Sequence, residues 1–147
     1  MSKTLVTVAQ RAKARFFRYE GPGKGLTEIE DLVHPASRAH EGDLVTDDPG
    51  RVKERAGPAT RSYGDEDKAS KHEAKVFAKQ VAQAITDYRT KEQYDRLILV
   101  AGPGFLGLLR ESLDGPSQKM IDGEVDKELT HLKAEELAER LEDVVAH

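Results

Sequence analysis

The segment Tyr94–Arg110, YDRLILVAGPGFLGLLR, constrains the fold of this chain more than any other part of the sequence. Leu97–Val100 is a continuous apolar run without polar alternation, which is typical of a strand that is covered on both faces in a parallel sheet. Glycines in Ala101–Gly104 interrupt the run, and apolar residues resume at helical spacing over Phe105–Leu109. The segment therefore predicts a buried strand, a glycine turn and an apolar helix, which together are a unit of an α/β sheet.

The composition indicates one domain, spanning residues 1–147. Of the 147 residues 37% are hydrophobic, which is enough for one core. The longest apolar run, Leu97–Ala101, is far shorter than the roughly 20 residues that span a bilayer, and the start of the chain has no apolar signal segment. The absence of cysteine excludes disulfides, thiolate catalysis and cysteine-ligated metals. We therefore expect a cytoplasmic protein without membrane insertion and without a cofactor.

Three strands are predicted before the first helix. Thr4–Ala9 and Lys13–Tyr19 have the pattern of a hairpin, and Leu26–Val33 follows a glycine-rich turn. From about residue 38 to residue 70 no periodicity is found, which predicts a long mobile loop. An apolar stripe over Lys71–Arg89 predicts a long helix after this loop.

The remaining elements complete an α/β order. We expect a strand at Arg96–Ala101, a helix at Gly104–Leu113, a last short strand at Lys119–Val125 and a terminal helix at Lys133–Val145. The order β-β-β-α-β-α-β-α is that of the ribonuclease H-like fold, with a mixed sheet and helices on both faces. A flavodoxin-like sheet needs helices between its first strands, and residues 5–33 leave no room for them.

The sequence offers little catalytic machinery. Two-metal nucleases of the ribonuclease H-like type need converging carboxylates from two strands and a helix, and here only Glu73 supplies one. No histidine pair has the i, i+4 spacing of helical zinc ligands, and no serine lies in a G-x-S-x-G motif. His72 beside Glu73 leaves a minor enzyme alternative open, but a histidine in the cap region of the helix is the simpler interpretation.

Two features remain as candidate binding sites. Gly102-Pro103-Gly104 resembles a phosphate loop only in part, because the P-loop lysine and a full G-x-G-x-x-G are missing, and Gly107 is expected to permit close packing on the sheet. A basic set of side chains can neutralise RNA phosphates, although interspersed acidic residues and few aromatic residues make a solvated surface the simpler interpretation. The basic set comprises Arg11, Lys13, Arg15, Arg51, Lys53, Arg55, Arg61, Lys71, Lys75 and Lys79.

Several strings resemble the bacterial host attachment protein family, whose members are described as required for attachment to host cells. They are VAQRAKARFF (Val8–Phe17), Pro49-Gly50-Arg51, His72-Glu73 with Phe77-Ala78, FLGLLR (Phe105–Arg110) and VDKELTHL (Val125–Leu132). The resemblance covers nearly the whole chain, and the last two strings together are fairly specific. It implies a non-enzymatic binding protein with a role in attachment to host cells.

This family is distantly similar to the middle domain of peptide-release factors, which implies an alternative: a translation-associated accessory factor that binds the ribosome or RNA. The glycine-glycine-glutamine signature of peptide release is absent, so release chemistry is not implied. Two departures from the family pattern stand out. Gln10-Arg11 replaces an Asp-Gly after the first strand, and Lys133 replaces a serine cap, at a cost of about 1 kcal/mol if nothing compensates.

From the resemblance and from fold analogy we expect an unknown protein partner, or the ribosome or RNA in the alternative, at the carboxyl edge of the sheet. No catalytic or metal-binding residue is predicted. The expected binding residues are Arg11, Arg15, Arg51, His72, Gly102, Gly104, Arg110, Lys127 and Thr130.

Overall fold

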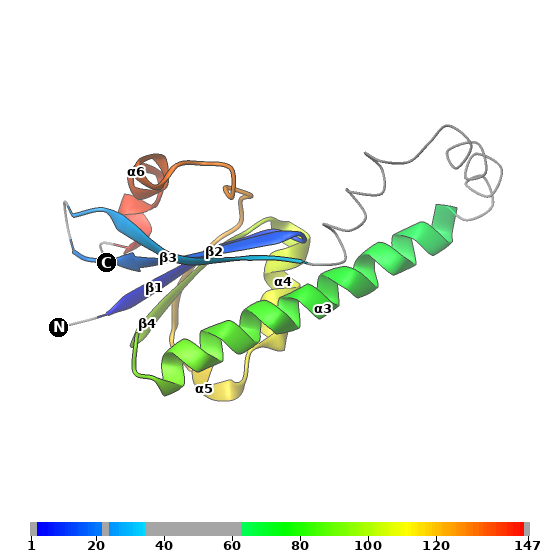
Figure 1. Ribbon diagram of the computed structural model, residues 1–147, viewed down its shortest axis with the longest axis horizontal. Coiled ribbons are helices and arrows are strands. Elements are labelled where there is room, and N and C mark those ends of the chain that lie inside the picture. The colour runs from blue at the N-terminus through cyan, green and yellow to red at the C-terminus, as the bar shows by residue number, and fades with distance from the viewer. Residues whose placement is uncertain (1–2, 22–23, 35–62, 146–147) are drawn as a thin grey trace.

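The structure, a computed structural model, describes residues 3–21, 24–34 and 63–145. Its elements follow the predicted order and form one mixed sheet with helices on both faces (Figure 1). They are β1 (Thr4–Ala9), β2 (Lys13–Tyr19), β3 (Leu26–Val33), α3 (Tyr63–Thr90), β4 (Arg96–Ala101), α4 (Pro103–Ser112), α5 (Gly115–Lys119), β5 (Ile121–Val125) and α6 (Ala134–Val145).

The five strands lie in the order β3-β2-β1-β4-β5. The first three form an antiparallel meander, whereas β4 runs parallel to both β1 and β5. The register of the central pair aligns Thr4 with Arg96 and Ala9 with Ala101, so β1 and β4 end at the same level. The segments that follow these two strands therefore leave the sheet side by side.

The sheet has a core on each face because side chains alternate along every strand. Leu5 of β1 and Leu97 of β4 pack beneath α3 and α4, and their neighbours Val6 and Ile98 pack beneath α6. Helix α3 covers its face with buried residues at i, i+3 and i+4 spacing. These residues are Ala74, Phe77, Ala78, Val81, Ala82 and Ile85.

Two predicted boundaries are corrected. Helix α3 begins at Tyr63, not at Lys71, and Figure 1 shows it running along the sheet and continuing past it. Residues 63–70 are therefore helical and not part of the predicted loop, whose remainder lies outside the described residues. The prediction relied on an apolar stripe, but a helix already nucleated extends through backbone hydrogen bonds without one. The last strand, β5, begins at Ile121 and not at Lys119, because Gly115–Lys119 forms the short helix α5, which the side chain of Asp114 caps.

A hydrogen bond at the start of α6 compensates in part for the missing serine cap at Lys133. This residue has no capping hydroxyl, but its backbone N–H donates to Oε1 of Glu136 at 3.0 Å. That bond is one half of a capping box, so one of the two reciprocal bonds of the motif is kept.

Glycine packing differs from the expectation for α4. A Cβ atom at Gly107 would meet nothing within 4 Å, so this glycine does not serve close packing on the sheet. The tightly packed glycine is Gly123 in β5, where a Cβ would lie 2.8 Å from Val144 Cγ1 and 3.1 Å from Ile98 Cδ1. Gly123 therefore lets α6 approach the parallel strands.

We predict opposite effects for alanine at these two glycines. Gly123→Ala should lower the free energy of unfolding by about 1–3 kcal/mol, because the new methyl group overpacks the core under α6. Gly107→Ala should raise it by about 0.5–1 kcal/mol, because alanine favours the helix and meets open space. Urea unfolding followed by circular dichroism measures both, and equal changes in the two variants would contradict the packing described.

Candidate functional site at the carboxyl edge of the sheet

A cavity of about 630 Å³ lies at the carboxyl edge of the central strands. We call it the edge cavity, and its walls come from the turn after β1, the turn after β4, the helices α3 and α4, and the segment after β5. Its lining residues are Gln10, Arg11, Lys71, Ala74, Lys75, Gly102, Pro103, Gly104, Phe105, Leu108 and Glu128. Three of the nine predicted binding residues, Arg11, Gly102 and Gly104, thus share one hollow.

A hydrogen-bonded chain forms the wall between β1 and the segment after β5. Gln10 donates from Nε2 to Thr130 Oγ1 at 2.9 Å, and the Thr130 hydroxyl donates to Glu128 Oε1. The backbone N–H of Thr130 donates to the same Glu128 oxygen at 2.8 Å. Thr130 is buried, so this predicted binding residue lies behind the cavity wall and holds Glu128 in place.

Glu128 presents a carboxylate at this wall. Burial raises the pKa of Glu128, but the hydrogen bonds from Thr130 and the nearby His131 outweigh that effect, and the pKa is lowered. Glu128 is therefore an anion at neutral pH, with Oε1 engaged by Thr130 and Oε2 at 3.6 Å from His131 Nδ1.

Arg15 holds the same segment from the other side. Its guanidinium donates to both carboxylate oxygens of Glu28, at 2.9 and 3.0 Å, and to the carbonyl oxygen of Thr130 at 2.9 Å. It also lies 4.9 Å from the ring centre of Phe17. The Glu28 carboxylate raises the pKa of Arg15, and Arg15 in turn lowers the pKa of Glu28. The donors of Arg15 thus serve the fold, joining β2 and β3 to the segment after β5.

Three further predicted binding residues, Arg110, Lys127 and His72, do not line the edge cavity. Arg110 donates to both carboxylate oxygens of Glu124, each at 2.8 Å, and so ties α4 to β5. Lys127 is exposed in the segment after β5, and Arg51 lies outside the described residues. His72 is exposed inside α3 and not at its start, since the helix begins at Tyr63, so the expected cap-region role does not apply.

Two cations at the edge cavity have no partner in the described part of the chain. Arg11 and Lys75 make no hydrogen bond or ion pair with any described residue. Four other arginines do have carboxylate partners: Arg15 with Glu28, Arg89 with Asp114, Arg96 with Asp122 and Arg110 with Glu124. The edge cavity thus carries positive charge that no described carboxylate pairs with, in a chain whose net charge is −4.

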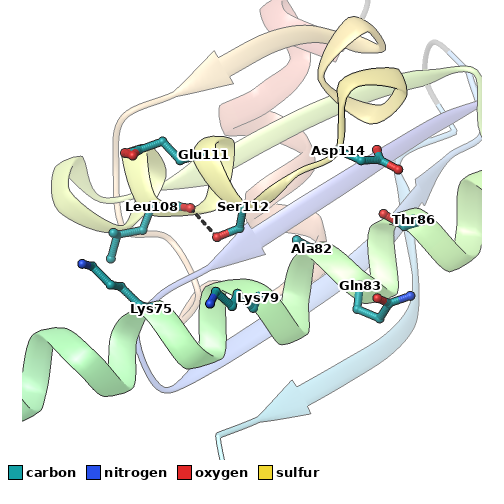
Figure 2. Close-up of a pocket in the computed structure, with 9 residues that line it drawn as sticks. All are labelled: Lys75, Lys79, Ala82, Gln83, Thr86, Leu108, Glu111, Ser112 and Asp114. Carbon is teal, nitrogen blue, oxygen red and sulfur yellow. Dashed lines mark hydrogen bonds between the residues drawn. The ribbon is translucent and has the colours of Figure 1, made fainter.

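A second hollow, of about 600 Å³, continues from the edge cavity between α3 and α4 (Figure 2). The two share Lys75 and Leu108. In Figure 2 Lys75 points from α3 toward Leu108 on α4, and Lys79 lies one turn farther along α3. Glu111 and Asp114 stand on the opposite wall, so this second hollow is of mixed charge.

The sequence did not identify Glu128 as a site residue. It lies three residues after the end of β5, at the same edge where Gln10 and Gly102 follow β1 and β4. The signal that could have identified Glu128 is its position just after the third parallel strand, because parallel strands end at one edge of the sheet.

The arrangement is suited to binding. Within the described residues no three histidine or carboxylate side chains form a group that could hold a metal ion. Around the edge cavity the described groups are cations, one carboxylate, an amide and apolar side chains.

None of the helices in the described ranges has the length and apolar character needed to cross a membrane.

Comparison with known proteins identifies the family. A family model described as "Protein required for attachment to host cells" matches residues 5–141. The chain belongs to this family. The matched residues include the strings FLGLLR and VDKELTHL. They also include the glycine turn before α4 and Glu128, which line the edge cavity of this host-attachment protein. A search of curated proteins finds no match.

Among solved structures the chain is similar to the crystal structure of an archaeal translation termination factor, aRF1. The TM-score is 0.55 and the sequence identity 14%, and the similarity covers 98% of this chain but 35% of the termination factor. The likeness therefore concerns the fold, and the host-attachment chain corresponds to about a third of that protein.

The pair of Arg15 and Glu28 predicts a pH dependence of stability. Because the pKa of Glu28 is lower in the folded protein than its usual 4.5, its contribution is present above pH 4.5 and is lost as pH falls through the lower folded pKa. Glu28→Gln should cost less than about 1 kcal/mol at neutral pH and should flatten the loss of stability on acidification. Urea unfolding at several pH values tests this, with Glu139→Gln on α6 as the control. Parallel pH profiles for wild type and Glu28→Gln would contradict it.

Proposed function

We propose that this protein is a non-enzymatic binding protein that acts in attachment to host cells and engages its partner at the edge cavity. The observation that carries the proposal is the pair of cations, Arg11 and Lys75, which line the cavity without a partner in the described part of the chain. Unpaired charges at a concave site favour a complementary ligand more than an exposed ion pair does. The role in attachment to host cells is proposed from the description of the family to which the chain belongs.

The glycines of the turn after β4 support the same site. Gly102 has φ −66° and ψ 165°, a conformation open to any residue, and a Cβ there would meet only Glu128 Cβ at an ordinary 3.8 Å. A Cβ at Gly104 would meet nothing within 4 Å. Neither packing nor backbone conformation requires glycine at these positions, and their effect is to keep the cavity wall open.

Filling the cavity should therefore abolish function without unfolding the protein. A strain lacking the protein is complemented with wild type, Gly104→Leu or Gly107→Leu, and cells attached to host cells are counted. We expect Gly104→Leu to lose attachment because its side chain occupies the cavity wall. Gly107→Leu is the matched control, since Gly107 lies in the same helix in open space but does not line the cavity. Thermal unfolding of both variants checks the fold.

Full attachment with Gly104→Leu would contradict the proposal. A double variant, Arg110→Ala with Lys127→Ala, tests the predicted binding residues that lie outside the cavity. Loss of attachment in this variant alone would move the site to the α4 and β5 side of the edge.

Association with the ribosome or RNA is the second candidate. The fold likeness to a translation termination factor favours it, and so do Lys75 and Lys79 of α3, which line the hollows without a partner among the described residues. It predicts sedimentation with ribosomes that weakens as salt is raised, because phosphate contacts release counterions.

A charge reversal on α3 tests this candidate. Lys75→Glu with Lys79→Glu should abolish co-sedimentation, whereas the control Lys91→Glu with Lys119→Glu, which makes the same charge change outside both hollows, should retain it. Absence of wild-type binding at low salt would dismiss the candidate.

A further inference from the structure

We infer that the edge cavity and the second hollow together, which we call the α3–α4 groove, bind an extended acidic segment of a partner protein. In this segment two acidic residues, separated by one residue, face Lys75 and Lys79. The inference rests on the proposed function, because it names the class of partner for the same site. It is carried by the length of the groove, the two lysines on its α3 wall and the hydrogen-bonding groups around it.

The two hollows form one elongated groove. They share Lys75 and Leu108, and together they follow α3 from Ala74 to Thr86. This stretch of helix is about 18 Å long, a length that an extended chain covers with about five residues. At the edge cavity Ala74, Phe105 and Leu108 offer apolar surface to a flanking apolar side chain. The shape therefore suits a peptide segment.

Lys75 and Lys79 give the α3 wall a regular spacing of positive charge. They lie four residues apart on one side of the helix, and both line the second hollow (Figure 2). Neither makes a hydrogen bond or an ion pair with a described residue. Their positions along the helix differ by about 6 Å. In an extended peptide, residues i and i+2 place their side chains on one face about 6.6 Å apart, so two such acidic residues can pair with both lysines at once.

Two carboxylates of the groove are engaged by other groups. Asp114 pairs with Arg89 at 2.9 Å, and Glu128 accepts the backbone N–H of Thr130 at 2.8 Å. Glu111 adds a third negative charge to the lining. A peptide can place acidic residues at the lysines and neutral residues at these carboxylates, whereas RNA carries a negative charge at every nucleotide. The mixed charge of the lining therefore favours a peptide over RNA.

The lining of the second hollow suits an extended chain more than a helix. A helix satisfies its own backbone groups and docks through an apolar stripe, whereas an extended chain needs partners for its backbone N–H and C=O groups. Ala82 and Leu108 are the apolar lining residues, and Gln83, Thr86 and Ser112 line the hollow with amide and hydroxyl groups. Gln83 and Ser112 each donate one hydrogen bond within the chain, so their oxygens can still accept from a peptide N–H.

Fluorescence anisotropy of labelled peptides with the full chain at low ionic strength tests the inference. The peptides Leu-Ala-Glu-Ser-Glu-Ser and Leu-Ala-Glu-Glu-Ser-Ser have the same composition and the same charge. We expect the first, alternating peptide to bind about two- to five-fold more tightly, the range for one additional exposed ion pair. In the second peptide the adjacent glutamates point to opposite faces, so only one of them can reach the lysines.

Lysine variants distinguish this pairing from general attraction between opposite charges. Lys79→Gln should abolish the preference for the alternating peptide, because Lys75 alone can pair with one glutamate of either peptide. Lys91→Gln, the same change of charge beyond the end of α3 and outside the groove, should keep the preference. The preference is a ratio measured within one variant, so a change in stability does not account for its loss.

Several results would overturn the inference. They are equal affinity of the wild type for the two peptides, no binding of either, and an unchanged preference in Lys79→Gln. Tighter binding of Leu-Glu-Ala-Ser-Ser-Glu than of the alternating peptide would overturn the extended conformation, because acidic residues four apart share one face of a helix. Tighter binding of a single-stranded RNA of six nucleotides would assign the groove to RNA.

The inference and the proposed function fail in different ways. If Gly104→Leu abolishes attachment but the wild type does not prefer the alternating peptide, the proposed function stands and the class of partner is wrong. If the preference is found and depends on Lys79 but Gly104→Leu leaves attachment intact, the peptide site stands and its role in attachment is wrong.

Discussion

The parallel pairing of β1 with β4 is the constraint on which the rest of the structure depends. The two strands come from distant parts of the sequence, yet β1 is wholly buried and β4 is buried from Leu97 to Ala101. Removing this apolar surface from water on both faces drives the pairing. The helices α3 and α4 cover one face and α6 the other because both faces of the pair must be buried. The same register aligns Ala9 with Ala101, and so brings Gln10 beside Gly102 at the edge cavity.

Arginine side chains then fix the connections around this sheet. Arg96 pairs with Asp122 and donates to the carbonyl oxygen of Val144 at the end of α6, where positive charge also favours the helix dipole. Arg15 holds the carbonyl oxygen of Thr130 while it pairs with Glu28, as described above. Such partly buried arginines position loops more than their ion pairs add stability. Arg11 and Lys75, which line the edge cavity, have no such carboxylate partner among the described residues.

The local sequence pattern predicted the bounds of the first four strands correctly. The bounds of β1, β2, β3 and β4 agree with the structure, because apolar alternation, apolar runs and turn residues mark each strand. The start of α3 at Tyr63 was missed, since residues 63–70 carry no apolar stripe. The role of the glycines was predicted wrongly, because Gly107 borders open space and the close packing is at Gly123. Which glycine is tightly packed depends on the element that lies over it in the folded chain.

By itself the sequence determined the order of the elements, the mixed α/β class and the family, because these follow from short-range periodicity and from strings such as FLGLLR. Only the tertiary structure decided which residues line one cavity. Arg11, Gly102 and Glu128 lie far apart along the chain and meet because three parallel strands end at one edge. Arg11 and Arg15 carry the same charge and were both predicted to bind a partner, but the neighbouring strand places Glu28 beside Arg15. The sequence shows which side chains are charged, whereas the fold decides which of them have an oppositely charged side chain beside them.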